Sequence, residues 1–571
     1  MVKLNNMKIL SIYPYLTISS AALLINGKIV SASCEERFNR NKMSTAFPIN
    51  AINWCLKNNN LSFEDLDLIT VPWNPQRNIN DASYRWSSDM RWRGEMITNI
   101  PLYLSRMMNT NPSNEFFQSF YKNKVKISYY DHHLCHAAFG YYNSKFSNAD
   151  ILVIDGRGEE DTCFTGYVSN NKFIKTGSVA YPHSIGIFYS SITNFLGFNP
   201  GTDEWKVMSL ASYSKSTNRY DKLLEDLIYL TPEGFEVNLS YFDYYNFDRK
   251  KFLFNKKLLN LLGPNRKLNE KINSKHIQIA GALQRLFEKA MYHMVRITKK
   301  RGKFSNLIVS GGAAMNSVFN GKLDKYNMYK DTHISFAPDD SGVTIGAAYY
   351  GYYKNKKIKN KTEVTDNFYG PSYSDDNVKK ILDNFKIKYK KSKNIYLETA
   401  KHLSEGKIIG WFQDKMEFGQ RALGNRSILC DPRKKNFQDK VNKAVKFRES
   451  FRPFAPAILH EKANDVFEKP KQRNIYFMER VYKIKKKWHK IIPAVTHIDG
   501  TGRLQTVNKD IHKKFYNLIK EFYKITDVPV LLNTSFNLNG EPVVMKPEDA
   551  IKTFYSCGLD ILVIGNYIIK K

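Results

Sequence analysis

The first part of the chain alternates short apolar runs with polar turns. Apolar positions between residues 8 and 32 are interrupted by the turn "ING" at 25–27, which predicts a β-hairpin. A helical pattern over 48–60 precedes the strand-like run "LDLITVPW". Further on, "ADILVIDGRGEEDTCFTGYV" predicts a strand, a turn that carries glycines and acids, and a second strand. This alternation of strands and helices is typical of an α/β fold.

The middle of the chain predicts a long helix that leads into a buried strand. Within "SKHIQIAGALQRLFEKAMYHMVRITKK" the apolar side chains recur at helical spacing. They are Ile277, Ala280, Leu283, Leu286, Phe287, Ala290, Met291 and Met294. The lysine- and asparagine-rich stretch 353–364 lacks apolar periodicity and predicts a linker. We therefore expect a first domain over 1–355, a connecting segment over 356–394 and a second α/β unit over 395–571.

Length and composition exclude several classes of protein. A chain of 571 residues with 42% hydrophobic residues is too long for one core and too apolar for a disordered protein. Its six cysteines form no C-x-x-C pair, which argues against a zinc ribbon or a disulfide framework and favours a reducing cytoplasm. No stretch approaches 18 consecutive apolar residues, so we expect no membrane span.

The formal net charge of +33 has two interpretations. A field of this size attracts nucleic acid and anionic membranes. The excess is mostly lysine, spread along the chain beside abundant asparagine. An AT-biased genome encodes both residues often at exposed positions, so the charge can also lack a function. The sequence leaves both interpretations open.

The stretch "YYDHHLCHAAF" over 129–139 contains the densest group of candidate metal ligands. On a helix, His132 and His136 at positions i and i+4 project from one face and can share an ion. A structural histidine pair is the competing interpretation.

Two aspartates add to the case for a metal. Asp155 ends an apolar strand, where α/β folds place ligands, and Gly156 and Gly158 beside it let backbone approach a phosphate. Asp340, in "FAPDDSGVTIGAA", stands at a helix start. Carboxylates with imidazoles suit a divalent ion, although each aspartate is also a common turn-forming cap.

These motifs together resemble one enzyme family. The ordered set "SAALLINGKIVSASCEERFNRNK", "DHHLCHAA", "VIDGRGE", "SIGIFYSSITNFLGF", "SGGAAMNSVFNG" and "PDDSGVTIGAA" resembles the carbamoyltransferases of the NodU/CmcH family over almost the entire chain. The resemblance implies an actin-like ATPase-fold first domain of two subdomains and a YrdC-like second domain. It also implies nucleotide-binding residues in the first domain, which are Gly156, Gly158, Gly311, Gly312, Asn316 and Asp340.

The sharpest match lies in the second domain, at "GWFQDKMEFGQRALGNRSILCDPRKKNFQDKVNKAVKFRESFRPFAPAIL". Five cations there are interleaved with large apolar residues, and they are Arg421, Arg426, Lys446, Arg448 and Arg452. A buried guanidinium needs an anion, and phosphate matches its geometry. Internal salt bridges to Glu417, Asp431 and Glu449 are the alternative. The resemblance adds Arg503, Asn533 and Ser535 to the pocket.

The resemblance implies a mechanism in two steps. ATP and carbamoyl phosphate would give carbamoyl-adenylate in the second domain, with Arg421 and Lys446 as catalytic residues. The first domain would then transfer the carbamoyl group to an acceptor hydroxyl. There a metal held by His132, His136, Asp155 and Asp340 would polarise the carbonyl, and Lys42 would stabilise negative charge. The similarity to the enzyme that attaches threonylcarbamoyl to tRNA suggests that this metal is iron, and magnesium and zinc remain alternatives.

One departure from the family pattern concerns the acceptor. Thr17 and Ile18 stand where the family has a His-Asp pair, which removes the most obvious general base. A small molecule or a sugar is the expected acceptor, and hydroxymethylated pyrimidines in nucleic acid are the alternative. A basic nucleic-acid-binding pseudoenzyme is the alternative of a different class. The sequence permits a homodimer without requiring one.

Overall fold

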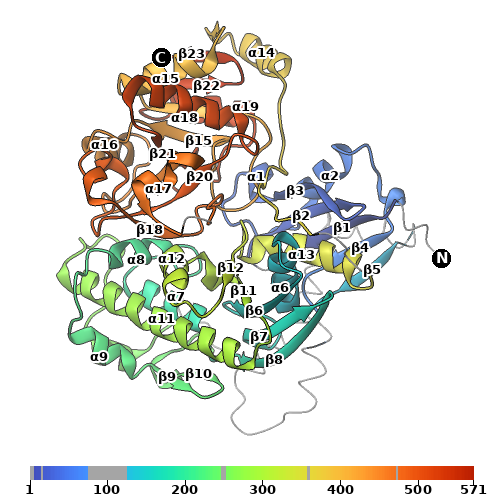
Figure 1. The fold of residues 1–571 in the computed structure, drawn as a ribbon, viewed down its shortest axis with the longest axis vertical. Helices are drawn as coiled ribbons and strands as arrows, with labels where there is room; N and C mark the ends of the chain where they lie inside the picture. The colour runs from blue at the N-terminus through green and yellow to red at the C-terminus, as the bar shows by residue number, and fades with distance from the viewer. Residues whose placement is uncertain are drawn as a thin grey trace. The chain divides into compact units, whose positions relative to one another are not determined.

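The structure is a computed structural model that describes residues 6–14, 17–74, 77, 122, 125–245, 252–356, 361–470 and 473–571. The chain divides into two compact units (Figure 1). Unit 1 comprises Met1–Glu35 and Met43–Val364, and unit 2 comprises Glu36–Lys42 and Thr365–Lys571. None of the described helices combines the length and the apolar character needed to cross a membrane.

Unit 1 contains two five-stranded sheets with the same strand order. The first runs β3-β2-β1-β4-β5 and the second, read from its other edge, runs β8-β7-β6-β11-β12. In each sheet the first three strands of the chain pair antiparallel and the last two pair parallel. The strands are β1 Lys8–Tyr13, β2 Ser20–Ile25, β3 Lys28–Cys34, β4 Leu68–Val71, β5 Lys126–Tyr129, β6 Asn148–Ile154, β7 Asp161–Ser169, β8 Lys172–Ala180, β11 Asn306–Ser310 and β12 Asp331–His333. This duplication is the arrangement of the actin-like ATPase fold, and it confirms the predicted fold of two subdomains.

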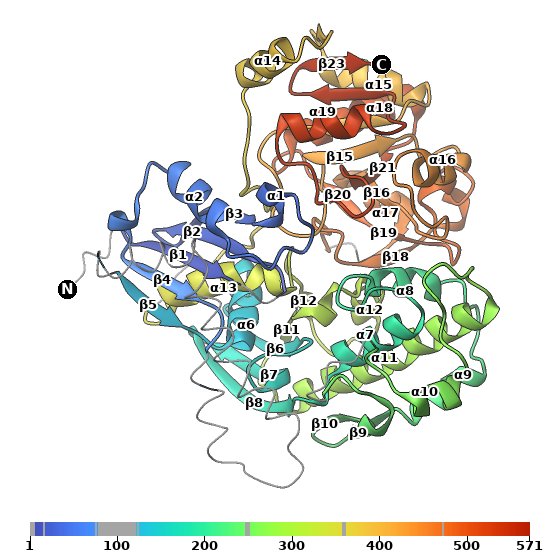
Figure 2. The ribbon, with the colours of Figure 1, turned by 180° about the vertical axis from the view of Figure 1, so that it is seen from behind.

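Two helices pack against each other between the sheets of unit 1. α6 (His132–Asn143) packs on β6 and β11, whereas α13 (Asp340–Tyr353) packs on β1, β2 and β4 (Figure 2). Glycines allow their close approach, since a Cβ at Gly346 would collide with the carbonyl oxygen of Cys135 on α6. The helix start at Asp340 is thereby held beside the first turn of α6.

The remaining elements of unit 1 lie around this centre. They are α2 Ile49–Lys57, α7 Ile185–Phe195, α8 Glu204–Ala211, α9 Arg219–Glu225, α10 Lys256–Leu262, α11 Ser274–Arg301 and α12 Ser317–Lys322, with the hairpin β9 Ile228–Thr231 and β10 Gly234–Val237. α11 is the long helix that the apolar spacing predicted, and its predicted face is buried except at Ile277, which is partly exposed.

Unit 2 is built on an eight-stranded mixed sheet of order β13-β23-β22-β14-β15-β21-β16-β20. Its strands are β13 Lys390–Lys391, β14 Ile409–Phe412, β15 Arg426–Cys430, β16 Ala455–Leu459, β20 Gln505–Val507, β21 Val530–Ser535, β22 Ile561–Ile564 and β23 Tyr567–Lys570. A three-stranded sheet joins β17 Phe467–Glu468, β18 Val481–Ile484 and β19 Thr501–Arg503. The helices are α1 Glu36–Asn39, α14 Asp375–Asn384, α15 Ile395–Ser404, α16 Asn436–Ala444, α17 Ala463–Val466, α18 Lys513–Thr526 and α19 Pro547–Tyr555. Helices over mixed sheets confirm the α/β class.

Two segments belong to unit 2 although sequence reasoning placed them elsewhere. Within the expected connecting segment, α14 and β13 form, and β13 extends the main sheet. Residues 36–42 lie far from unit 2 in sequence but pack with it. There Arg40 donates hydrogen bonds to the carbonyl oxygens of Pro542 and Val543, at 2.9 and 2.7 Å.

Candidate functional site

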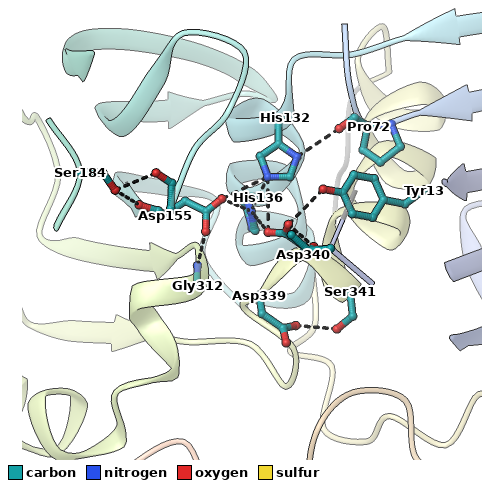
Figure 3. Close-up of polar contacts among 12 residues, drawn as sticks. Tyr13, Pro72, His132, His136, Asp155, Ser184, Gly312, Asp339, Asp340 and Ser341 are labelled. Atoms are coloured by element: carbon teal, nitrogen blue, oxygen red, sulfur yellow. Dashed lines mark hydrogen bonds and ion pairs between the residues drawn. The ribbon is translucent and has the colours of Figure 1, made fainter. Parts of the chain in front are cut away.

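The two histidines of α6 meet at the centre of unit 1 (Figure 3). His132 and His136 lie one helical turn apart and are fully buried. Their Nε2 atoms are 3.2 Å apart. The main-chain carbonyl of Pro72 lies 3.2 Å from Nδ1 of His132, which favours the tautomer with the proton on Nδ1. In the neutral ring, Nε2 of His132 is then the nitrogen available to a metal.

Two aspartates approach this histidine pair from different elements. Asp155 follows β6 and Asp340 begins α13. Oδ2 of Asp155 lies 3.2 Å from Nε2 of His132 and 3.5 Å from Nε2 of His136, while Oδ1 of Asp340 lies 3.5 Å from both. All four ligand atoms lie within 4.8 Å of one another. The four residues expected from the sequence to bind a metal are thus brought together as one group, the His-Asp cluster.

Hydroxyl groups complete the surroundings of Asp340. The hydroxyl of Tyr13 donates to Oδ2 of Asp340 at 3.0 Å, and the hydroxyl of Thr17 donates to the same atom at 2.5 Å. Thr17, which stands where the family pattern has histidine, therefore lies beside the His-Asp cluster. Its hydroxyl can orient a group at this site but is no base at neutral pH.

Opposite charges in the His-Asp cluster shift the pKa values of its members. Burial disfavours protonated His132, but the charge of Asp340 and the hydrogen bond to Asp155 outweigh it and raise the pKa of His132 well above its usual value. Burial likewise disfavours ionised Asp155, yet hydrogen bonds from His132 and His136 hold its pKa well below the usual range. Without a ligand the cluster therefore compensates its charges internally.

The donor set of the His-Asp cluster fits a divalent metal. Two imidazole nitrogens and two carboxylate oxygens converge, and among the described residues Nδ1 of His136 is buried without a hydrogen-bond partner. Such a mixed nitrogen and oxygen set suits iron or zinc better than magnesium. His132, His136, Asp155 and Asp340 would hold the ion, and its binding stays a prediction.

The glycines expected to contact nucleotide surround Asp155, whereas Asn316 lies in a different setting. The N–H of Gly312 donates to Oδ1 of Asp155 at 2.8 Å, and the carbonyl of Gly156 accepts from Ser184. Gly311 has φ +92°, and a Cβ there would collide with the backbone of β6. Gly158 approaches the ring of His133. Asn316 caps α12 and exchanges hydrogen bonds with Gln284, and its contact with nucleotide stays a prediction.

Unit 2 contains a second group of charges, and these are all of one sign. Burial lowers the pKa of Arg503 well below its usual value, and the charges of Arg421, Arg448 and Arg452 lower it further. The pKa values of Lys446 and Arg448 are lowered for the same two reasons. We call Arg421, Lys446, Arg448, Arg452 and Arg503 the cation cluster.

Lys446 is the most deeply buried member of the cation cluster. Its side chain is 3% exposed, and Nζ donates to oxygens of Ser535 and Asn537, including the Asn537 side chain at 2.7 Å. All of these acceptors are neutral. Lys42, which belongs to unit 2, is a further cation whose charge lowers the pKa of Lys446. The sequence motifs had assigned Lys42 to the first domain.

The carboxylates that could have neutralised this cluster are mostly engaged elsewhere. Asp431 pairs with Arg433 at 2.7 Å, and Glu417 accepts backbone N–H groups of Leu423 and Asn425. Glu449 reaches a member of the cluster, lying 3.3 Å from Arg452. The charges of neighbouring cations lower the pKa values of Lys446, Arg448 and Arg503, which indicates an excess of positive charge around these three residues.

Three further residues expected in the pocket have different positions. Arg426 is fully buried and donates to carbonyl oxygens of Asn425 and Pro371 at 3.0 Å each, with its guanidinium over the ring of Phe412. It is thus a structural arginine apart from the cation cluster. Ser535 lies at the cluster through Lys446, whereas the amide nitrogen of Asn533 donates to Gln505 at 2.9 Å.

Comparison with known proteins places this site in a family. The model described as "Carbamoyltransferase N-terminus" matches residues 8–349, and "Carbamoyltransferase C-terminus" matches 400–571. The chain belongs to the carbamoyltransferase family. Nodulation protein NolNO of Sinorhizobium fredii is 32% identical over 97% of this chain and 78% of its own. An uncharacterized protein of Synechocystis is 32% identical over 99% and 96%.

Solved structures of other proteins are similar to part of this carbamoyltransferase. Component A of the (R)-2-hydroxyglutaryl-CoA dehydratase of Acidaminococcus fermentans is 17% identical and covers 61% of this chain and 98% of its own, with a TM-score of 0.33. HypF of T. kodakarensis is 12% identical over 61% of this chain and 47% of its own, also with a TM-score of 0.33.

The structure of this carbamoyltransferase also shows a site residue that sequence reasoning missed. Glu159 is 4% exposed, and its carboxylate accepts the backbone N–H of His132 at 3.0 and 3.1 Å and that of Asn74 at 2.7 Å. It thereby fixes the start of α6. Burial raises its pKa to about 7. Its position four residues after Asp155, in the same acidic turn, was the signal available in the sequence.

Proposed function

We propose that this carbamoyltransferase activates the carbamoyl group with ATP in unit 2 and transfers it to an acceptor hydroxyl at the His-Asp cluster of unit 1. The observation that carries the proposal is the cation cluster. Lys446 and Arg452 are buried, and neighbouring cations lower the pKa values of Lys446, Arg448 and Arg503. Such a group of cations favours an anionic ligand of high charge density, and phosphates match that description.

The proposed activation uses both phosphate-bearing substrates. Water cleaves carbamoyl phosphate to carbamate and inorganic phosphate, and an oxygen of the carbamate attacks the α-phosphorus of ATP. Pyrophosphate leaves, and carbamoyl-adenylate remains. Lys446 and the arginines hold the phosphates and stabilise the charge that develops during this displacement.

The proposed transfer uses the His-Asp cluster. A divalent metal bound there would act as a Lewis acid toward the carbonyl or phosphate of the adenylate. Asp340 is held by Tyr13 and Thr17, and Asp155 by Gly312, so the chain fixes the orientation of both carboxylates. The acceptor hydroxyl attacks the carbamoyl carbon, and AMP leaves. We propose a small molecule or a sugar as the acceptor.

The experiment that tests this proposal is pyrophosphate release from ATP with and without carbamoyl phosphate, in the absence of acceptor. We expect release that depends on carbamoyl phosphate. A folded protein that releases no pyrophosphate with both substrates present would contradict the proposal. An acceptor screen then follows, with hydroxymethylated DNA as a separate arm at two salt concentrations.

A further inference from the structure

The imidazole of His497 is influenced by the charge of Arg503, a member of the cation cluster. Nδ1 of His497 lies 3.1 Å from the hydroxyl oxygen of Thr501. The hydroxyl of Thr501 in turn donates to Asp499 at 2.6 Å. On the other side of the ring, Nε2 is buried and has no hydrogen-bond partner among the residues that the structure describes. A buried nitrogen without a partner is costly in a native protein and indicates that a ligand is expected there.

The hydrogen-bond chain assigns the tautomer of His497. Because the proton of the Thr501 hydroxyl points to the carboxylate of Asp499, the hydroxyl oxygen is free to accept. Nδ1 of His497 is therefore the protonated nitrogen, and Nε2 carries the lone pair. Burial lowers the pKa of His497 to about 4, and Arg503 lowers it as well, against the opposing effects of Asp499 and the Phe454 carbonyl. The imidazole is neutral at pH 7, so Nε2 is an acceptor.

A donor whose charge acts on His497 also lacks a partner. Arg503 is the member of the cation cluster whose charge acts on His497, and its Nε is buried without a hydrogen-bond partner among the described residues. Arg448, another member, lies over the ring of Phe454 at 4.6 Å. The surroundings thus offer many N–H donors for oxygen atoms and one lone pair for an N–H group.

A carbamoyl group is the ligand that matches this pair. Its amide offers N–H donors and a carbonyl oxygen on one carbon, and in carbamoyl phosphate the anionic phosphate is attached directly. We propose that Nε2 of His497 accepts a hydrogen bond from the amide N–H of carbamoyl phosphate, so that unit 2 selects a carbamoyl over an acetyl group. The inference rests on the proposed function and assigns the recognition of its substrate.

Steady-state kinetics of pyrophosphate release by the full chain test this assignment. Acetyl phosphate, which has a methyl group in place of the amide, serves as a competing ligand. In His497→Leu we expect the KM for carbamoyl phosphate to rise about 10- to 100-fold, which is the loss expected for one buried hydrogen bond. The inhibition constant of acetyl phosphate and the KM for ATP should change less than about threefold.

Two further measurements separate recognition from a merely structural role. Nitrogen NMR of the histidines should show the proton of His497 on Nδ1, and Thr501→Val should raise the KM for carbamoyl phosphate by a smaller factor. His402→Leu, which changes a histidine paired with exposed Glu405, is the matched control and should leave all constants unchanged.

The outcomes distinguish this inference from the proposed function. A proton on Nε2, or equal changes for carbamoyl and acetyl phosphate in His497→Leu, would overturn the inference while pyrophosphate release by the wild type stands. A selective rise in the KM for ATP would also overturn the inference, since Nε2 of His497 would then accept its hydrogen bond from the adenine and not from the carbamoyl group. Wild-type protein without carbamoyl-phosphate-dependent release would overturn both.

Discussion

The two units contain buried charge clusters of opposite design. In unit 1 two carboxylates and two imidazoles lie within hydrogen-bonding or ion-pair distance and compensate one another. In unit 2 the buried cations lower one another's pKa values. The His-Asp cluster can exist without a ligand and release protons when a metal binds. In the cation cluster the like charges repel one another, and a bound anion would reduce that repulsion. The difference predicts a metal site in unit 1 and a phosphate site in unit 2 that share no residues.

The largest effect on activity is expected when one cation is removed from unit 2. Lys446→Met should lower carbamoyl-phosphate-dependent pyrophosphate release by about 100- to 1,000-fold, because a buried donor to the reacting phosphates is lost. Lys443→Met, which changes an exposed lysine on α16 three residues before Lys446, is the control and should keep its activity. Equal activity of the two variants would contradict the assignment of the phosphate site.

The corresponding change in unit 1 removes a metal ligand. Asp340→Asn should weaken binding of iron(II) or zinc by more than about 100-fold, since losing even an outer-shell partner typically costs 10- to 100-fold. Calorimetric titration of the metal measures it. Asp226→Asn, which alters an exposed carboxylate of unit 1, should bind metal as the wild type does. Unchanged affinity in Asp340→Asn would refute the His-Asp cluster as the metal site.

Stability should respond with opposite signs in the two units. Arg503→Met removes a like charge from the cation cluster and should raise the free energy of unfolding by about 1–3 kcal/mol. His132→Leu leaves two carboxylates with one imidazole and should lower it by about 3–5 kcal/mol in metal-free protein. Urea unfolding measures both values. Destabilisation by Arg503→Met would show that its charge is compensated in the ligand-free protein.

Proton linkage gives the smallest and most specific difference. Burial and the neighbouring arginines lower the pKa of Lys446, and a bound polyphosphate would favour its protonated form, so binding should take up protons and weaken as pH rises. Metal binding needs neutral His132, whose pKa is raised, and should therefore release protons and strengthen as pH rises. Calorimetry in buffers of different ionisation enthalpy gives both signs. Equal signs would contradict the contrast between the clusters.

The sequence predicted the His-Asp cluster better than the cation cluster. His132 and His136 are related by helical spacing, and Asp155 follows a recognisable strand, so local pattern alone suffices to propose a shared site. Whether an arginine is satisfied by backbone carbonyls depends on tertiary packing. Arg426 and Arg503 therefore look alike in the sequence, although only Arg503 lies among other cations.

Long-range packing explains the other differences. Residues 36–42 carry no local sign that they fold with unit 2, because their partners are distant in the sequence; Val543, for example, lies 503 residues after Arg40. The acceptor nitrogen of His497 depends on a hydrogen-bond chain through Thr501 and Asp499, which a sequence pattern does not show.

Exchange of labelled pyrophosphate into ATP is the most direct test of the central claim, that the two clusters perform separate half-reactions. It is measured with carbamoyl phosphate present and without acceptor, in the wild type, in Asp340→Asn and in Lys446→Met. We predict that Asp340→Asn retains exchange but carbamoylates no acceptor, whereas Lys446→Met loses exchange. Loss of exchange in folded Asp340→Asn, or its retention in Lys446→Met, would contradict the division of labour between the units.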